Sequence, residues 1–85
     1  MPKSVFTDAY ASVVEYLIDL RQAQGMHQAD LAKRLGKRQQ FVSKVENRLR
    51  RLDVVEFFAY VHALGGDPEE AAAKVIQTLP KDTRI

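Results

Sequence analysis

Four small or apolar residues in the middle of this 85-residue chain restrict most tightly what it can fold into. They are spaced by four, six and three positions: Ala32, Gly36, Val42 and Val45. Two helices that cross at a steep angle through a short turn need a small residue where they pack, a glycine that adopts a positive φ angle in the turn, and an apolar inner face on the second helix. The four residues meet these requirements in that order. The spacing therefore predicts two crossing helices, over residues 28–35 and 39–47.

The rest of the chain also favours helices over strands. It contains no alternating apolar pattern, no hairpin turn signal and no internal repeat. Asp53 with Glu56, and Asp67 followed by Pro68, have the spacing of helix N-terminal caps. We expect three further helices, from residue 4 or 7 to about residue 24, from residue 54 to about 64, and from residue 68 to about 79. The predicted fold is an all-α, compact five-helix domain over residues 1–79, followed by a C-terminal tail at residues 80–85.

Composition excludes several classes of function. The chain has no Cys, and therefore no disulfide, thiolate nucleophile or cysteine-based metal site. No stretch approaches the roughly 20 apolar residues of a membrane helix, and the N-terminus lacks the apolar core of a signal peptide. His27 and His62 have no acidic residue at metal-ligand spacing, and there is no glycine-rich phosphate loop. We therefore expect a cytoplasmic protein that is not an enzyme and uses no metal, cofactor or membrane.

Positive charge is concentrated in one segment. Between Lys33 and Arg51 lie eight of the 13 basic residues and a single acidic residue, Glu46, so this segment carries a net charge of +7 and the remaining chain −5. A basic patch beside an acidic body is the pattern expected of a protein that binds nucleic acid. The alternative is that these charges form an ordinary solvated surface.

The outer face of the helix at 39–47 favours nucleic acid. With Val42 and Val45 turned inward, a rotation of about 100° per residue places Gln40, Lys44 and Asn47 outward. Ser43 lies close to that direction, and Gln39 lies at its flank. Every residue on this face forms hydrogen bonds and none is acidic, whereas a merely solvated helix normally includes Asp or Glu. Gln can form two hydrogen bonds to adenine, and Lys donates to guanine.

From Leu20 to Gly65 the chain resembles the helix-turn-helix domains of phage repressors, Cro proteins and xenobiotic-response-element regulators. The resemblance is carried by LRQAQGMHQADLAKRLGKRQQFVSKVEN and the following RRLDVVEFFAYVHALGGDP. It implies a lambda-repressor-like bundle with its helix-turn-helix at about residues 28–47. It also implies a transcriptional regulator, a repressor, that binds double-stranded DNA sequence-specifically in the major groove.

The resemblance assigns roles to individual residues. Base contacts fall on Gln39, Gln40, Ser43 and Lys44. Gln28 is expected to hold a phosphate and to brace the first residue of the second helix of the motif, and Arg21 is expected to pair with Glu46. The remaining contacts to the DNA backbone are expected from Arg38, Asn47, Arg48, Arg50 and Arg51, of which the last three lie in the loop after that helix.

The chain departs from the family pattern at three positions. Lys37 stands where an apolar residue is usual in the turn. Arg48 replaces the glycine that commonly follows the recognition helix, which suggests a helical extension through Leu49. Phe41 stands where small hydroxyl residues are frequent, and its angle predicts packing at the rim of the core rather than contact with a thymine methyl group.

Surplus apolar residues suggest a second contact surface. In the helix that begins after Asp53, the residues that can pack in the core are Val54, Phe57, Phe58, Val61 and Leu64. Val55 and Tyr60 are then surplus apolar surface. A homodimer face is predicted from these two together with Ala72, Val75, Ile76 and Leu79; the alternative is that the last helix only closes the core. A homodimer would bind a palindromic operator with half-sites about 10 base pairs apart. From another class of function, the alternative is a small antitoxin or adaptor whose main role is to bind a partner protein.

Overall fold

The computed structural model describes residues 2–79, with side chains from residue 9 onward, and this part of the chain contains helices and no strands. Five helices follow one another in the order α1 (Pro2–Ala23), α2 (Gln28–Leu35), α3 (Gln39–Glu46), α4 (Val54–Ala63) and α5 (Pro68–Thr78). The predicted all-α, five-helix fold is confirmed. None of these helices is long and apolar enough to cross a membrane. The tail predicted at residues 80–85 lies outside the described residues.

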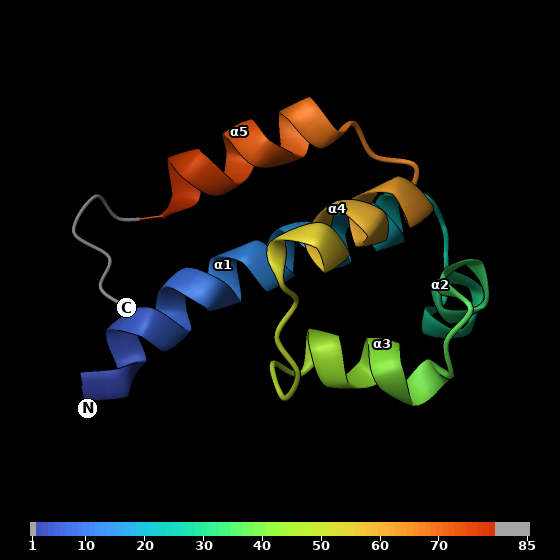
Figure 1. The fold of residues 1–85 in the computed structure, drawn as a ribbon, viewed down its shortest axis with the longest axis horizontal. Coiled ribbons are helices and arrows are strands. Elements are labelled where there is room, and N and C mark those ends of the chain that lie inside the picture. Colours follow the sequence, from blue (N-terminus) through green and yellow to red (C-terminus); the bar gives the residue numbers. More distant parts are fainter. Residues whose placement is uncertain (1, 80–85) are drawn as a thin grey trace.

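The helices enclose one core, and in the view of Figure 1 α5 lies on one side of α1 and α4 and α3 lies on the other. Every helix contributes at least one side chain that is no more than 2% exposed: Val14, Leu17, Leu31, Ala32, Val42, Val45, Tyr60, Val61 and Ala71. Burial of each larger aliphatic side chain stabilises the fold by about 1.5–3 kcal/mol. The arrangement leaves the outer face of α3 free of helix packing.

The bounds of the helices differ little from the predicted ones, except that α1 begins at Pro2 rather than at residue 4 or 7. Proline is favourable at the first helical position, because its missing N–H would have no partner there. The capping box before α4 is confirmed: the Asp53 carboxylate accepts from the Glu56 N–H at 2.7 Å, and the Glu56 carboxylate accepts from the Asp53 N–H at 3.0 Å. Asp67 caps α5 by accepting from the Glu69 N–H at 2.9 Å.

The inner face of α4 was predicted wrongly. Tyr60 was expected to be surplus, but it is 1% exposed at the centre of the core. Val54 was expected to serve the core, but it is 74% exposed. Apolar residues occur on every face of α4, so its hydrophobic pattern alone does not determine which face packs against the core. Burial raises the pKa of the Tyr60 hydroxyl.

Both helices of the helix-turn-helix end in the same way. Gly36 adopts a left-handed conformation (φ 68°) after α2, and the N–H groups of Gly36 and Lys37 donate to the carbonyls of Lys33 (3.1 Å) and Ala32 (2.9 Å). These two hydrogen bonds form a Schellman motif, in which glycine is favoured because it lacks a Cβ atom. The turn therefore depends on Gly36 as the sequence suggested.

Arg48 takes the corresponding position after α3, and the predicted helical extension through Leu49 is wrong. Its φ angle is 60°, the one positive φ angle at a non-glycine residue among those described. The N–H groups of Arg48 and Leu49 donate to the carbonyls of Val45 (3.0 Å) and Lys44 (2.8 Å), as in the motif after α2. A left-handed conformation costs a residue with a Cβ atom about 1–2 kcal/mol. The left-handed conformation of Arg48 reverses the direction of the chain after α3, so that it can continue towards α4.

Arg50 holds the loop between α3 and α4. Its guanidinium donates two hydrogen bonds of 2.9 Å to the two carboxylate oxygens of Glu56, and one of 2.6 Å to the carbonyl of Arg51. It also lies over the ring of Phe41, 4.9 Å from the centroid. The hydrogen bonds from Arg50 lower the pKa of Glu56 to about 2, and the N–H of Asp53 acts in the same direction. Arg50 thus connects α3, its loop and the first turn of α4.

The predicted pair of Arg21 and Glu46 is confirmed. The Nε and Nη2 atoms of Arg21 donate to the Glu46 carboxylate at 2.6 and 3.1 Å, and Nη1 donates to the carbonyl of Met26 at 2.7 Å. The two side chains are only 12% and 8% exposed. A nearly buried pair of this kind is shielded from solvent screening, and each charge depends on the other. It ties the end of α1 and the following loop to the last turn of α3.

Removal of one member of this pair should destabilise the protein strongly. We expect Arg21→Met to lower the free energy of unfolding by about 3 kcal/mol, because it leaves the Glu46 carboxylate buried without a countercharge. The double variant Arg21→Met, Glu46→Leu should recover part of this loss. Urea denaturation of the wild type, both single variants and the double variant measures the coupling energy. Strictly additive losses would show that the pair does not act as a unit.

The pH dependence of stability should reveal the ion pair of Arg50 and Glu56. Because the pKa of Glu56 is lower in the folded protein than its ordinary value near 4.5, this carboxylate stabilises the fold above that value, and the stabilisation is lost as the pH falls towards 2. The free energy of unfolding should therefore fall less between pH 5 and pH 2 in Glu56→Gln than in the wild type. Identical profiles, measured by urea denaturation at each pH, would contradict the assignment. Glu15→Gln on α1 controls for the loss of one negative charge.

Candidate nucleic-acid interface

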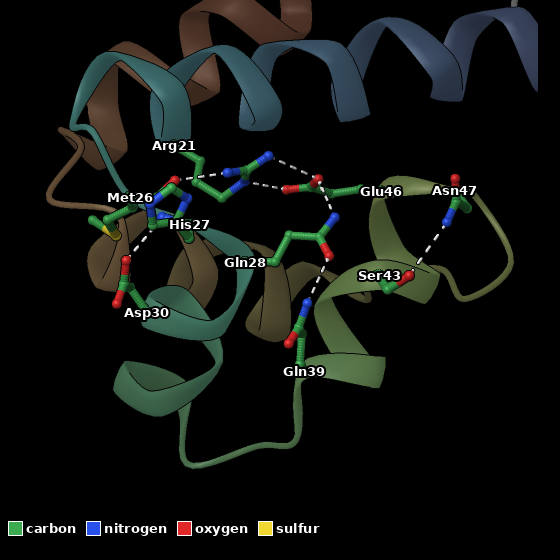
Figure 2. A network of polar contacts seen from close by, with 9 residues as sticks. All are labelled: Arg21, Met26, His27, Gln28, Asp30, Gln39, Ser43, Glu46 and Asn47. Atoms are coloured by element: carbon green, nitrogen blue, oxygen red, sulfur yellow. Dashed lines mark hydrogen bonds and ion pairs between the residues drawn. The ribbon is translucent and has the colours of Figure 1, made fainter.

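The outer face of α3 projects from the bundle. Val42 and Val45 are fully buried, so that Gln40 and Lys44 on the opposite side of the helix point into the solvent. Ser43 lies between the buried and the exposed side and is half-buried. Asn47 caps the end of the helix and is exposed. Its amide Nδ2 donates to the Ser43 hydroxyl at 3.4 Å (Figure 2). The structure thus brings the predicted base-contacting residues together on one face.

A chain of side chains holds the first residue of α3. The Gln39 Nε2 atom lies 3.5 Å from the Gln28 Oε1 atom, a long hydrogen bond, and the Gln28 Nε2 atom donates to Glu46 at 2.9 Å (Figure 2). Glu46 is in turn held by Arg21. The bracing of Gln39 by Gln28, which the family resemblance implied, is therefore present. Because both ends of the Gln28 amide are occupied, the Gln39 side chain is restricted before any ligand is bound.

The start of α2 lies next to this chain of contacts. His27 occupies the N-terminal cap position of α2, and its backbone N–H donates to the Asp30 carboxylate at 2.9 Å (Figure 2). The preceding Met26 is buried, and its carbonyl accepts a hydrogen bond from Arg21. Thus the loop before α2 and the end of α3 are anchored to the same guanidinium, which places the start of α2 relative to the end of α3.

Six of the eight basic residues between Lys33 and Arg51 fall into two groups. Arg34 and Arg50 serve the fold: Arg34 donates to the carbonyl of Ala63 at the end of α4 (3.1 Å), and Arg50 binds Glu56. Exposed positions along α3 and its ends are taken by Arg38, Lys44, Arg48 and Arg51. Arg51 lies over the ring of Tyr10, 4.9 Å from its centroid. The second group is therefore the one that can meet an anionic partner.

The segment presents positive charge outward because its one acidic residue is turned inward. Glu46 has a side chain that is 8% exposed and bound to Arg21. The Coulomb field in front of α3 is therefore set by the exposed Lys and Arg side chains, without an exposed carboxylate from this segment. Such a surface attracts phosphates, while the amides of Gln39 and Gln40 can form directed hydrogen bonds.

Besides the ion pair of Arg50 with Glu56, sequence reasoning missed two further sets of contacts in this region. Phe41 packs against the core, as expected, but its ring also lies beside two cations, Arg50 at 4.9 Å and Lys37 at 5.5 Å. Lys37 therefore uses the aromatic ring in place of the apolar packing usual at its position. The contact of Arg34 with the end of α4 is the second. Lys or Arg near a helix C-terminus is a known signal, but here the arginine and the helix are far apart in sequence.

Comparison with known proteins agrees with this geometry. A family model described as helix-turn-helix matches residues 17–70. Among solved structures, the chain is similar to an XRE-family like protein from Pseudomonas syringae pv. tomato str. DC3000. The two share 39% sequence identity and a TM-score of 0.83, over 93% of this chain and 96% of the other. No curated protein matches. On its sequence and its fold, the chain belongs to the XRE-type helix-turn-helix family of DNA-binding transcription regulators.

Proposed function

We propose that this protein binds double-stranded DNA by placing α3 in the major groove, where Gln39, Gln40, Ser43 and Lys44 contact base edges. The observation that carries the proposal is the outer face of α3, which projects from the bundle, bears only hydrogen-bonding side chains and has no exposed acid. A major groove admits an α-helix, and its base edges offer distinct patterns of donors and acceptors. The amides of Gln39 and Gln40 match adenine, and the ammonium group of Lys44 matches guanine.

The DNA backbone is contacted by residues around α3. Arg38 lies directly before α3 and Arg48 follows its C-terminal cap, so that they flank the groove-facing helix and reach the phosphates on either side. Gln28, whose Nε2 atom has a second N–H besides the one that it donates to Glu46, and Asn47 add hydrogen bonds at the two ends of the motif. Arg51 extends the basic surface into the loop. Arg50 contributes to the positive field while its guanidinium positions this loop through Glu56.

The protein acts as a homodimer on a palindromic operator. A single module buries only about 600–1,000 Å² on DNA, which gives few base contacts. Two copies related by a two-fold axis double these contacts, provided that their α3 helices lie one helical turn apart, about 34–36 Å. Repression is the simplest consequence, because a bound dimer occupies the operator without needing a further activity. The alternative of an antitoxin or adaptor accounts for a protein-binding surface but not for the acid-free face of α3.

Base contacts predict a loss that depends on DNA sequence. Gln40→Ala and Lys44→Ala should each weaken binding to the cognate site by about 1–3 kcal/mol and leave binding to random-sequence DNA nearly unchanged. Gln77→Ala and Lys74→Ala, which change the same residue types on the exposed surface of α5, should alter neither affinity. Fluorescence anisotropy with both kinds of duplex measures the difference. Equal losses on the two duplexes would exclude base contacts from these side chains.

Arg48 should show a trade between stability and DNA binding. Arg48→Gly removes the strain of the left-handed conformation and should raise the free energy of unfolding by up to about 1 kcal/mol. The same variant should weaken binding to every DNA sequence and reduce the slope of log affinity against log salt concentration by about 0.9, as expected for one lost phosphate contact. A more stable variant with an unchanged salt slope would show that Arg48 does not contact the DNA.

A further inference from the structure

One large apolar side chain is exposed inside the basic segment. Leu49, in the loop between α3 and α4, is 77% exposed. Arginines surround it in the sequence, at positions 48, 50 and 51. A single exposed leucine needs no explanation by itself, so its significance depends on how the fold holds it. The other exposed large apolar side chains of the described residues all lie on α4 and α5: Val54, Val55, Phe58 and Ile76.

Backbone hydrogen bonds fix Leu49 at the end of α3. Its N–H donates to the carbonyl of Lys44 at 2.8 Å, and the N–H of Arg50 donates to the same carbonyl at 3.2 Å. The preceding Arg48 has the left-handed conformation, with a φ angle of 60°. Residues in strained backbone conformations cluster at binding and catalytic sites, where the surrounding structure holds them in place. The backbone of Leu49 is therefore fixed relative to α3, although its side chain lies in the solvent.

The motif after α3 places Leu49 next to Lys44. In a Schellman motif, the residue after the left-handed one commonly makes an apolar contact with the helix residue whose carbonyl it binds. Leu49 and Lys44 occupy these two positions. Lys44 is exposed and ends in an ammonium group, so it cannot bury the leucine. An uncovered apolar side chain is thus held beside a residue that is proposed to contact bases.

We propose that Leu49 is a further specificity-determining residue, which contacts the C5-methyl group of a thymine next to the bases met by α3; this rests on the DNA binding of the proposed function. The thymine methyl group is the apolar feature that base edges present in the major groove, and apolar side chains recognise it. The hydrogen-bonding residues of α3 match adenine and guanine. A leucine beside them adds recognition of a thymine, which an amide or an ammonium group does not supply.

The rest of the DNA surface suits Leu49 less well. Phosphate oxygens lose hydration without gaining a hydrogen bond when an apolar side chain covers them. Arg48 and Arg51, which are exposed on either side of Leu49, can donate to these oxygens instead. Deoxyribose carbons are also apolar, but they follow the backbone rather than the base edges. The hydrogen bond to Lys44 keeps Leu49 close to the helix that is proposed to lie among the base edges.

Replacement of thymine by deoxyuridine tests the contact, because it removes the C5-methyl group and nothing else. The probe is a duplex selected from a random pool by the wild-type protein, with its thymines replaced one at a time. We expect one replacement in a half-site to weaken binding of the wild type about fourfold, the effect of one buried carbon group. Leu49→Ala should bind the thymine and deoxyuridine duplexes at that position alike. Leu49→Met, which keeps an apolar side chain of similar volume, should retain most of the difference.

Fluorescence anisotropy gives the affinities, and circular dichroism shows that each variant is folded. Replacements that affect the wild type and Leu49→Ala equally at every thymine would overturn the proposal. So would a Leu49→Ala variant that weakens binding to all duplexes by one factor, as loss of a contact with deoxyribose or with another subunit would do. If the wild type still prefers the selected duplex to random sequence in these cases, the proposed function stands. A wild type without that preference would remove both proposals.

Discussion

The proposed DNA-binding face of this protein, the outer face of α3, depends on the ion pair between Arg21 and Glu46. It lies almost entirely out of solvent at the meeting point of α1, the loop before α2 and the last turn of α3. Removing two charges from water is costly, so a pair of this kind adds little net stability compared with apolar residues in the same place. What it supplies is geometry, because a guanidinium and a carboxylate that share two hydrogen bonds allow few relative orientations. We infer that the pair fixes α3 against the bundle.

Hydrogen bonds connect Glu46 to the surface of α3. Gln28 donates to this carboxylate and accepts from Gln39, so that one buried charge restricts the first side chain of the exposed helix. Hydrogen bonds in a partly buried environment restrict the side chains that they join. Restricting an amide before binding reduces the conformational entropy that is lost when it forms hydrogen bonds to a base. The basic segment can contain the acidic residue Glu46 because Arg21 neutralises its charge inside the fold.

Local signals in the sequence predicted most of the fold. The caps at Asp53 and Asp67 and the glycine at position 36 define helix ends through backbone hydrogen bonds that involve only neighbouring residues. The pairing of Arg21 with Glu46 came from the family resemblance, since no local rule connects residues so far apart. The orientation of α4 could not be predicted, because Val54 and Tyr60 are both apolar and only the packing of the other helices decides which is buried. Arg48 misled the prediction for a related reason: its left-handed conformation is imposed by where the chain must go next, not by its own preference.

The charge pattern predicted a basic surface but not which of its basic side chains bind other parts of the fold. Arg34 and Arg50 bind the end of α4 and Glu56, and these partners became visible only with the tertiary structure. The central claim is that the braced outer face of α3 distinguishes DNA sequences. Selection of duplexes from a random pool by the wild-type protein, followed by sequencing, tests it most directly. We predict enrichment of two inverted half-sites about 10 base pairs apart, each containing adenine and guanine where Gln and Lys side chains of α3 meet the bases. Bound duplexes that share no motif beyond the starting pool would contradict the claim.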